Sequence, residues 1–337
     1  MNQIIQQICI DRYLTPYKLG RPVIAPSGVE GAFNKCAVDC PFVFYHNDKF
    51  YMTYVGFDGK GYQTALAVSK DLINWETKRI ILSRDEERGW DSVSIAGTWI
   101  IKNDNLFELP TLKKIDGKYW LVYHSYPGHG YEEGPAEIGL AWSDDDELLR
   151  WNRLDKPVFS WKDGIDWERG GLYKACIVEN NGIYYMFYNA KNCKKRLWTE
   201  QIGLATSSDL IYWERYPSNP VLTITENNWD SRFVSDPYVV KDNNIWVMFY
   251  YGYNGIYAQN GIAFSKDLLY WEKYKKPILS NGKDGEIDER YAHKPAVIYY
   301  DNRLYHFYCA VRKYREGDIA KNFNEFRTIS VASSNPF

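Results

Sequence analysis

One sequence unit recurs five times along this chain, and that repetition restricts the possible folds more than any other feature. The copies begin about every 60 to 70 residues, and each joins an apolar strand, an Asn, Asp or Gly turn and an aromatic strand, as in a β-hairpin. They read DCPFVFYHNDKFYMTYVG from Asp39, ELPTLKKIDGKYWLVYHS from Glu108, YKACIVENNGIYYMFYNA from Tyr173, SDPYVVKDNNIWVMFYYG from Ser235 and HKPAVIYYDNRLYHFYCA from His293. The pattern predicts an all-β fold of five similar units.

The segments that follow each hairpin also repeat. A third strand leads into a Ser-x-Asp-Leu-x-x-Trp turn, whose tryptophan we expect to pack between strands, and a short fourth strand comes next. The third segments are TALAVSKDLINWE from Thr64, IGLAWSDDDELLRWN from Ile138, IGLATSSDLIYWE from Ile202 and GIAFSKDLLYWE from Gly261. The fourth are RIIL from Arg79, PVFS from Pro157, PVLT from Pro220 and PILS from Pro277. The fifth unit stops after ISVASSNPF from Ile329.

The missing fourth strand of the last unit has a counterpart near the start of the chain, where Arg21 to Ala25 reads RPVIA. The repeats therefore predict a five-bladed β-propeller with four-stranded blades, in which this N-terminal strand closes the last blade. Such closure leaves few free sheet edges. No linker rich in Pro, Gly or Ser interrupts the pattern, so we expect a single domain over residues 1–337, with residues 1–20 as a lead-in.

Charge and composition exclude several partners. A formal net charge of -2 gives no basic field for nucleic acid, and no apolar run is long enough to span a membrane. The first 20 residues lack the apolar stretch of a signal peptide, which predicts a cytoplasmic protein. The closest of the six cysteines, Cys36 and Cys40, lack the spacing of a zinc site. We expect free thiols and neither a metal nor a cofactor.

Strand ends of a propeller meet around its central channel, so the residues at these ends are the candidates for function. The inner strands start with Asp39, Glu108, Tyr173 with Lys174, Ser235 with Asp236, and His293 with Lys294. The second strands end with Phe57 and Asp58, His124 and Tyr126, Asn189 and Lys191, Tyr253 and Asn254, and Arg312. These positions would be interchangeable in a purely structural ring, yet most are ionisable and each differs. That contrast indicates a binding pocket.

The residue types at these positions favour glycosidic bond cleavage. One carboxyl group must protonate the leaving oxygen while a second activates water or attacks the sugar, and Asp39, Glu108 and Asp236 are the candidates. An Asp that caps a turn before proline is the structural alternative. The expected substrate-binding residues are His293, Lys174, Lys294, Tyr173, His124, Asp58 and Arg312. For His293, a buried polar or supporting role is an equal alternative.

Two other motifs are interpreted as architecture. Acidic residues recur just before the inner strands. For Asp91, Asp230 and Asp288 the repetition favours a structural role, in which the carboxylate accepts backbone or arginine hydrogen bonds near the junction of two units, while Glu168 is left open. The Gly-rich segment PGHGYEEG from Pro127 is interpreted as a hairpin loop, because it does not join a strand to a helix as a phosphate loop does.

With these motifs in view, nearly the whole chain resembles the superfamily of five-bladed propeller glycosidases, which includes families 43, 32, 62, 117 and 130. The resemblance rests on the Asp-x-Pro start at Asp39, the aromatic second strands and the Ser-x-Asp-Leu-x-x-Trp-Glu turns. Similarity to family 43 implies that Asp39 is the general base and that the reaction inverts the anomeric configuration. With no signal peptide, small imported oligosaccharides are the expected substrates.

The chain also departs from that pattern. Family 43 places an Asp on the third blade and a Glu on the fourth, where this sequence has Tyr173-Lys174-Ala175 and Ser235-Asp236-Pro237. The departure leaves Glu108 or Asp236 as the acid. It is closer to the family 117 type, in which an Asp and a fifth-blade His take part, and His293 fits that role.

Two alternatives to hydrolysis are kept. Lys174 and Lys294, with Arg232, Arg290 and Arg312 nearby in the repeat, predict anion binding, either of a uronic acid or of the inorganic phosphate that family 130 phosphorylases use. These cations could also simply neutralise the carboxylates of the channel. A propeller that binds carbohydrate without catalysis is the third interpretation, and the set of acidic residues counts against it.

Overall fold

A computed structural model describes residues 4–194 and 197–337 of the chain. Within that part there are twenty strands, β1 to β20, and three short 3₁₀ helices at Ile5–Gln7, Ile10–Tyr13 and Trp161–Asp163. The prediction of an all-β chain is therefore confirmed. In the described ranges no helix has the length and apolar character needed to cross a membrane.

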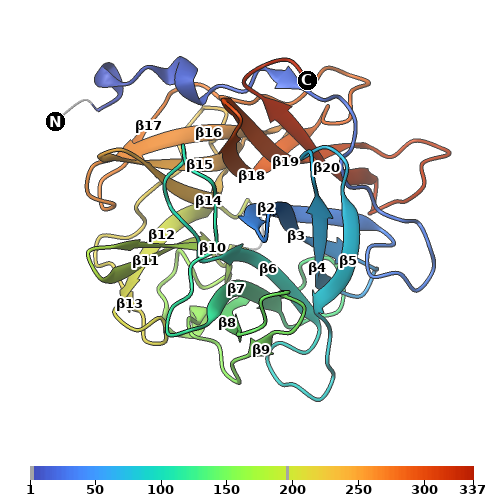
Figure 1. Cartoon of the computed structure of the whole chain (residues 1–337), viewed down its shortest axis with the longest axis horizontal. Coiled ribbons are helices and arrows are strands. Elements are labelled where there is room, and N and C mark those ends of the chain that lie inside the picture. The colour runs from blue at the N-terminus through green and yellow to red at the C-terminus, as the bar shows by residue number, and fades with distance from the viewer. Residues whose placement is uncertain (1–3, 195–196) are drawn as a thin grey trace.

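The strands form antiparallel groups of consecutive strands arranged around a common centre (Figure 1). Two groups are separate sheets, β2 to β5 and β6 to β9. Three more, β10 to β13, β14 to β17 and β18 to β20 with β1, merge into one 12-stranded sheet through single parallel pairs, Glu200 with Phe233 and Ala258 with Tyr291. In each group the first strand lies nearest the centre (Figure 1).

The bounds of the strands, group by group, are as follows. The first two groups contain β2 (Ala37–His46), β3 (Lys49–Phe57), β4 (Tyr62–Ser69), β5 (Glu76–Leu82), β6 (Ser94–Ile100), β7 (Tyr119–Tyr126), β8 (Glu137–Ser143) and β9 (Asn152–Arg153). The third and fourth contain β10 (Gly171–Asn180), β11 (Ile183–Lys191), β12 (Glu200–Ser207), β13 (Glu214–Arg215), β14 (Phe233–Asp242), β15 (Ile245–Tyr253), β16 (Ala258–Ser265) and β17 (Glu272–Lys273). The last contains β18 (Tyr291–Tyr300), β19 (Arg303–Lys313), β20 (Glu325–Ser333) and β1 (Tyr17–Lys18).

The two ends of the chain meet in the last group. Tyr17 pairs with Ser333, and Ile24 forms a bridge with Ile329, so the N-terminal segment runs along β20. The equivalent bridges elsewhere join Ile138 to Phe159, Ile202 to Leu222 and Asn260 to Leu279. The expected fourth strands at Pro157, Pro220 and Pro277 are thus reduced to single bridges, because proline has no N–H to donate to a ladder.

The second group corrects one sequence-based expectation. Its inner strand is β6, at Ser94–Ile100, and not the segment expected from Glu108. Residues 101–118 are an extra connection between β6 and β7, and its turn at Asp116 and Gly117 resembles the hairpin turns of the other units. The pattern search found that turn and missed β6, which is buried along its whole length and therefore shows no alternation of apolar and polar residues.

The recurring acidic and tryptophan motifs are architectural, as expected. The indole N–H groups of Trp75, Trp151, Trp213 and Trp271 each donate to the carbonyl three residues earlier. Buried Asp91, Glu168 and Asp288 accept from the hydroxyls of Tyr123, Tyr188 and Tyr308. Asp230 pairs with Lys273. Glu168, which the sequence left open, belongs with this set because it also pairs with Arg215.

Candidate functional site

Four inner strands carry a β-bulge at the same place, and this bulge decides which side chains face the centre of the molecule. Pairing slips between Asp39 and Phe42 in β2, and at the same point in β10, β14 and β18, so that two residues face one on the partner strand. The first of the two bulge residues is Cys40 in β2, Lys174 in β10, Asp236 in β14 and Lys294 in β18. Cys40, Asp236 and Lys294 have positive φ values of 50, 55 and 60°. The bulge turns these side chains toward the channel.

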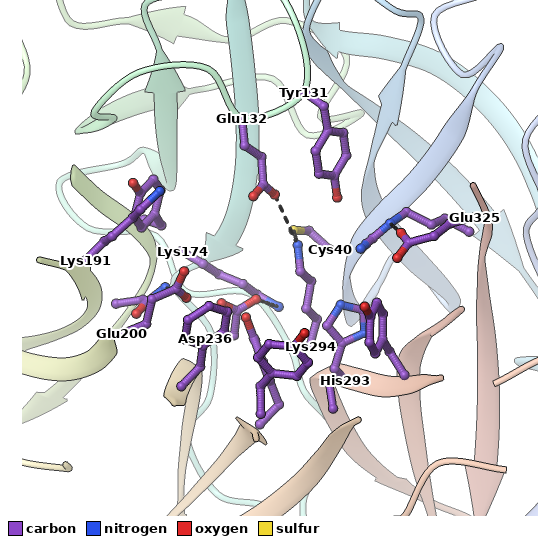
Figure 2. Close-up of a pocket in the computed structure, with 18 of the residues that line it drawn as sticks. Cys40, Tyr131, Glu132, Lys174, Lys191, Glu200, Asp236, His293, Lys294 and Glu325 are labelled. Atoms are coloured by element: carbon purple, nitrogen blue, oxygen red, sulfur yellow. Dashed lines mark hydrogen bonds and ion pairs between the residues drawn. The ribbon is translucent and has the colours of Figure 1, made fainter. Parts of the chain in front are cut away.

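A cavity of about 570 Å³ opens there, and all four bulge residues line it (Figure 2). Lys174 and Asp236 face each other, with Nζ and Oδ2 3.6 Å apart. Lys294 Nζ lies 3.9 Å from Cys40 Sγ and 3.6 Å from Glu132 Oε1. Burial raises the pKa of the Cys40 thiol to about 12, so it stays protonated at neutral pH.

Asp39 lies behind this surface and does not line the cavity. Its Oδ2 lies 3.0 Å from Lys294 Nζ and 3.1 Å from Arg327 Nη1, and it accepts from the Tyr131 hydroxyl at 3.3 Å. Burial alone would raise the pKa of Asp39, but Lys294 and Arg327 outweigh that effect and hold it well below its usual range. The bulge explains the placement, because Cys40 and not Asp39 takes the position that faces the channel. Asp39 therefore holds the side chains of Lys294 and Arg327 in place in the cavity wall.

Glu200 is a carboxyl group of the cavity that the sequence reasoning missed. It is the first residue of β12, and its Oε2 accepts from Asn189 and from the Ser235 hydroxyl, both at 3.1 Å. Burial raises its pKa, the Asn189 hydrogen bond opposes that rise, and the negative charges of Glu132 and Asp236 add to it. A carboxyl group whose pKa is raised holds its proton to higher pH than an ordinary glutamate, which suits general acid catalysis.

Glu132 is the second missed residue. It lies on the Gly-rich loop between β7 and β8, and in Figure 2 its carboxylate points into the cavity toward Lys294. Its Oε1 accepts from the Tyr62 hydroxyl at 3.0 Å and lies 3.6 Å from Lys294 Nζ. The sequence feature that could have identified it is the pair of consecutive glutamates in a loop, on the face of the molecule where the second strands end.

A simple rule of strand direction, applied to the sequence, would have included Glu200 among the candidate site residues. A third strand starts at the face where the second strand ends, so third-strand starts also belong to the candidate set. Four of these residues line the cavity, namely Tyr62, Glu200, Ala258 and Glu325. The fifth, Glu137 at the start of β8, pairs with Lys162 and does not line it.

Both predicted histidines line the cavity and are neutral there. The Nδ1 atom of His293 is 3.0 Å from the Cys309 carbonyl, so it must carry the proton and leave Nε2 as an acceptor. Burial, with Arg327 and Lys294, holds the pKa of His293 well below its ordinary value. His124 Nδ1 accepts the backbone N–H of Lys174, and burial lowers its pKa to about 3. At neutral pH neither histidine is in the protonated, positively charged form that could act as a general acid.

Aromatic rings form a wall of the same cavity. Tyr126 and Tyr173 stack with centroids 5.3 Å apart, and Tyr62 and Tyr131 meet edge to face. Rings of this kind pack against the apolar faces of sugars while their hydroxyls reach polar groups. Tyr173 was predicted from the sequence to bind substrate, and it lines the cavity.

Six of the predicted residues meet at this cavity, and four do not. Lys174, Lys294, Tyr173, His124, His293 and Asp236 line it, whereas Asp39, Glu108, Asp58 and Arg312 do not. Asp58 pairs with Arg84 at 3.0 Å, and Arg312 pairs with Asp318. The carboxylate of Glu108 accepts from Asn103 and Asn105 in the connection between β6 and β7, so the structure does not bring it to the site.

Replacing Glu108 by glutamine is therefore expected to leave kcat and KM unchanged within about twofold. Its two acceptor contacts are exposed, and such hydrogen bonds contribute about 1 kcal/mol or less to stability. Initial-rate kinetics on a cleaved oligosaccharide would check this result. A loss of more than about 100-fold, the scale of a missing general acid, would restore Glu108 as the acid.

Comparison with known proteins gives a consistent assignment. Residues 108–291 match the family model described as "Glycosyl hydrolases family 32 N-terminal domain". A solved structure of a BT0996–RGII complex has a TM-score of 0.85 and 31% identity, with 100% of this protein and 96% of that one covered. A thermostable family-43 glycoside hydrolase has a TM-score of 0.66 at 20% identity, with 91% of each chain covered, which shows similarity of fold.

A curated relative adds a different activity. The 1,2-beta-oligomannan phosphorylase of Thermoanaerobacter sp. (strain X514) is 28% identical over 148 residues, covering 42% of this chain and 49% of the relative. The chain thus matches about half the length of that phosphorylase.

Proposed function

Because the chain belongs to the family described as glycosyl hydrolases family 32 N-terminal domain, we propose that it hydrolyses a glycosidic bond of a small oligosaccharide in the central cavity. One observation carries this proposal. Glu200, a carboxyl group with a raised pKa, shares the cavity with a second carboxylate, Glu132, next to the positive charge of Lys294. Two carboxyl groups in different environments are the apparatus that glycoside hydrolysis requires.

In the proposed reaction each group has one role. Glu200 donates its proton to the glycosidic oxygen as the bond from that oxygen to the anomeric carbon breaks. Glu132 takes a proton from a water molecule whose oxygen bonds to the anomeric carbon on the opposite face. Inversion of configuration follows from this arrangement.

The bulge residues would bind the sugar. Asp236 was considered as the acid from the sequence, but its Oδ2 lies 3.6 Å from Lys174 Nζ on the cavity floor. We propose that this pair binds sugar hydroxyls, with His293 Nε2 as a further acceptor. Both Lys174 Nζ and Asp236 Oδ2 are buried without a hydrogen-bond partner among the described residues, as expected of groups that await a ligand.

The finer architecture is part of the same proposal. We propose that the groups of strands are the blades of one five-bladed propeller over residues 1–337, with residues 1–20 as the lead-in. Pairing of β1 and Ile24 with β20 supports closure of the last blade by the N-terminal segment. The family-43 neighbour supports the same fold.

Phosphorolysis is the second candidate, supported by the related phosphorylase and by the cations of the cavity. We expect hydrolysis, and so the rate of bond cleavage should be the same with and without inorganic phosphate. A screen of aryl glycosides and short oligosaccharides, with sugar 1-phosphate measured in parallel, would test this. Cleavage that requires phosphate and yields a sugar 1-phosphate would favour phosphorolysis.

A further inference from the structure

Six cations line the cavity, and three of them differ from the others in their partners. Lys294 pairs with Asp39 and Glu132, Arg327 with Asp39 and Glu325, and Lys174 with Asp236. Lys191, Arg232 and Arg290 also line the cavity, yet none forms an ion pair with an acidic residue in the part of the chain that the structure describes. These three residues therefore add positive charge to the cavity wall without forming an ion pair among the described residues.

The two arginines occupy equivalent positions that have no structural need for charge. Arg232 and Arg290 immediately precede β14 and β18, and the N–H of each donates to the carbonyl of Tyr253 or Val311 on the neighbouring strand. Immediately before β10 and β2, the same backbone bond is made by Gly170 and Cys36. Because an uncharged residue suffices there, the guanidinium groups call for another explanation.

Aromatic rings hold these cations while leaving hydrogen-bond donors open. The Arg232 guanidinium lies 4.9 Å from the Trp198 ring centroid, the Arg290 guanidinium 5.6 Å from that of Tyr291, and Lys191 Nζ 4.4 Å from that of Trp198. Contact with a ring face orients a guanidinium without using its N–H groups. On Arg232 only Nε has a hydrogen-bond partner within the described ranges, the Trp198 carbonyl at 3.4 Å. The free edge matches the planar geometry of a carboxylate.

We propose that Arg232 and Arg290 bind the carboxylate of a uronic acid unit in the substrate, with Lys191 adding positive charge beside them. This inference rests on the proposed function for its choice of a carbohydrate ligand. It names a substrate class for the proposed hydrolysis, namely acidic oligosaccharides. A phosphate ester on the sugar is the other anion with suitable chemistry, and the experiment distinguishes the two.

The test measures binding of unreacted monosaccharides by isothermal titration calorimetry. Glucuronate and galacturonate are compared with glucose and galactose, and with glucose 6-phosphate and inorganic phosphate. We expect at least one uronate to bind about tenfold or more tightly than its neutral parent, the scale of a charge-assisted hydrogen bond. Arg232→Gln and Arg290→Gln should each reduce that ratio toward one, and the preference should weaken as NaCl rises.

Arg303→Gln is the matched control, because Arg303 also lies over an aromatic ring, that of Tyr305 at 5.7 Å, but does not line the cavity. It should keep the uronate preference. Equal binding of uronates and neutral sugars would overturn the inference, and so would a preference that survives in both cavity variants. Arginine-dependent binding of phosphate or glucose 6-phosphate without uronate binding would overturn the carboxylate assignment.

The same data separate this inference from the proposed function. A uronate preference in a protein that cleaves no glycoside would leave the binding site standing and refute hydrolysis. Cleavage of neutral glycosides with no preference for acidic ones would refute the uronate site alone.

Discussion

Replacing Glu200 by glutamine is expected to lower kcat on an oligosaccharide by about 10²- to 10⁴-fold, the range that a positioned general acid contributes. Glutamine keeps the size of the side chain and can still accept from Asn189 and Ser235, but its amide cannot supply the proton that the leaving oxygen needs. Initial rates of reducing-sugar release, fitted for kcat and KM separately, would measure the loss.

The leaving group makes this test specific. A dinitrophenyl glycoside departs as a stable anion without protonation, so the Glu200→Gln enzyme should retain most of its bond-cleaving rate on that substrate. Glu137→Gln is the matched control, because Glu137 begins β8 as Glu200 begins β12 but contacts Lys162 outside the cavity. Equal losses on both substrates would show that Glu200 is not the acid. A loss in Glu132→Gln on both substrates would support Glu132 as the base.

The direction in which activity changes with pH also follows from the role of Glu200. Glu200 must be protonated to act, and its raised pKa keeps the proton to higher pH than an ordinary glutamate would. Activity should therefore fall as pH rises through that pKa, and the Glu200→Gln enzyme should lack this alkaline fall.

Replacing Asp39 by asparagine is expected to lower the free energy of unfolding by about 3 to 5 kcal/mol, the cost of leaving buried charges without their partner. The side chain of Asp39 is 1% exposed, and its loss would leave Lys294 with Glu132 alone and Arg327 with Glu325 alone as acidic partners. Urea denaturation at neutral pH would measure the change. Asp58→Asn is the control, since Asp58 pairs with the more exposed Arg84 and should cost about 1 kcal/mol or less.

Acidification gives this prediction a second readout. The pKa of Asp39 is depressed in the folded protein, so its contribution to stability is complete above the unfolded value of about 3.9 and is lost as pH falls below it. The difference between the wild type and Asp39→Asn should be constant from about pH 5 to 8 and shrink in stronger acid. Unchanged stability with lost turnover would instead support Asp39 as the general base.

The repeats predicted the strand content and the face on which the cavity lies, because a hairpin and its turn are local patterns. They did not predict which of two neighbouring residues faces the channel. Asp39 and Cys40 differ by one position, and the bulge that selects Cys40 depends on pairing with β3, which a single strand's sequence does not specify.

Other residues were missed for different reasons. Glu200 follows a general rule of strand direction and could have been nominated, whereas Glu132 lies on a loop outside the repeat, whose path depends on tertiary contacts such as that with Tyr62. Glu108 shows the opposite error. Its segment resembled the repeat, while the true inner strand β6 lacked the alternation on which the search relied.

The ion pair between Asp39 and Lys294 joins residues 255 positions apart, from the first group of strands and the last. During synthesis Asp39 leaves the ribosome long before its partner. In the same way, β1 can pair only after β20, near the other end of the sequence, has been made. Contacts of such sequence separation form late and slow folding, because a long loop must close before they contribute. The charges that order the cavity wall are thus complete only when the last group of strands has formed. A protein truncated before β18 would lack the electrostatic arrangement on which the proposed chemistry depends.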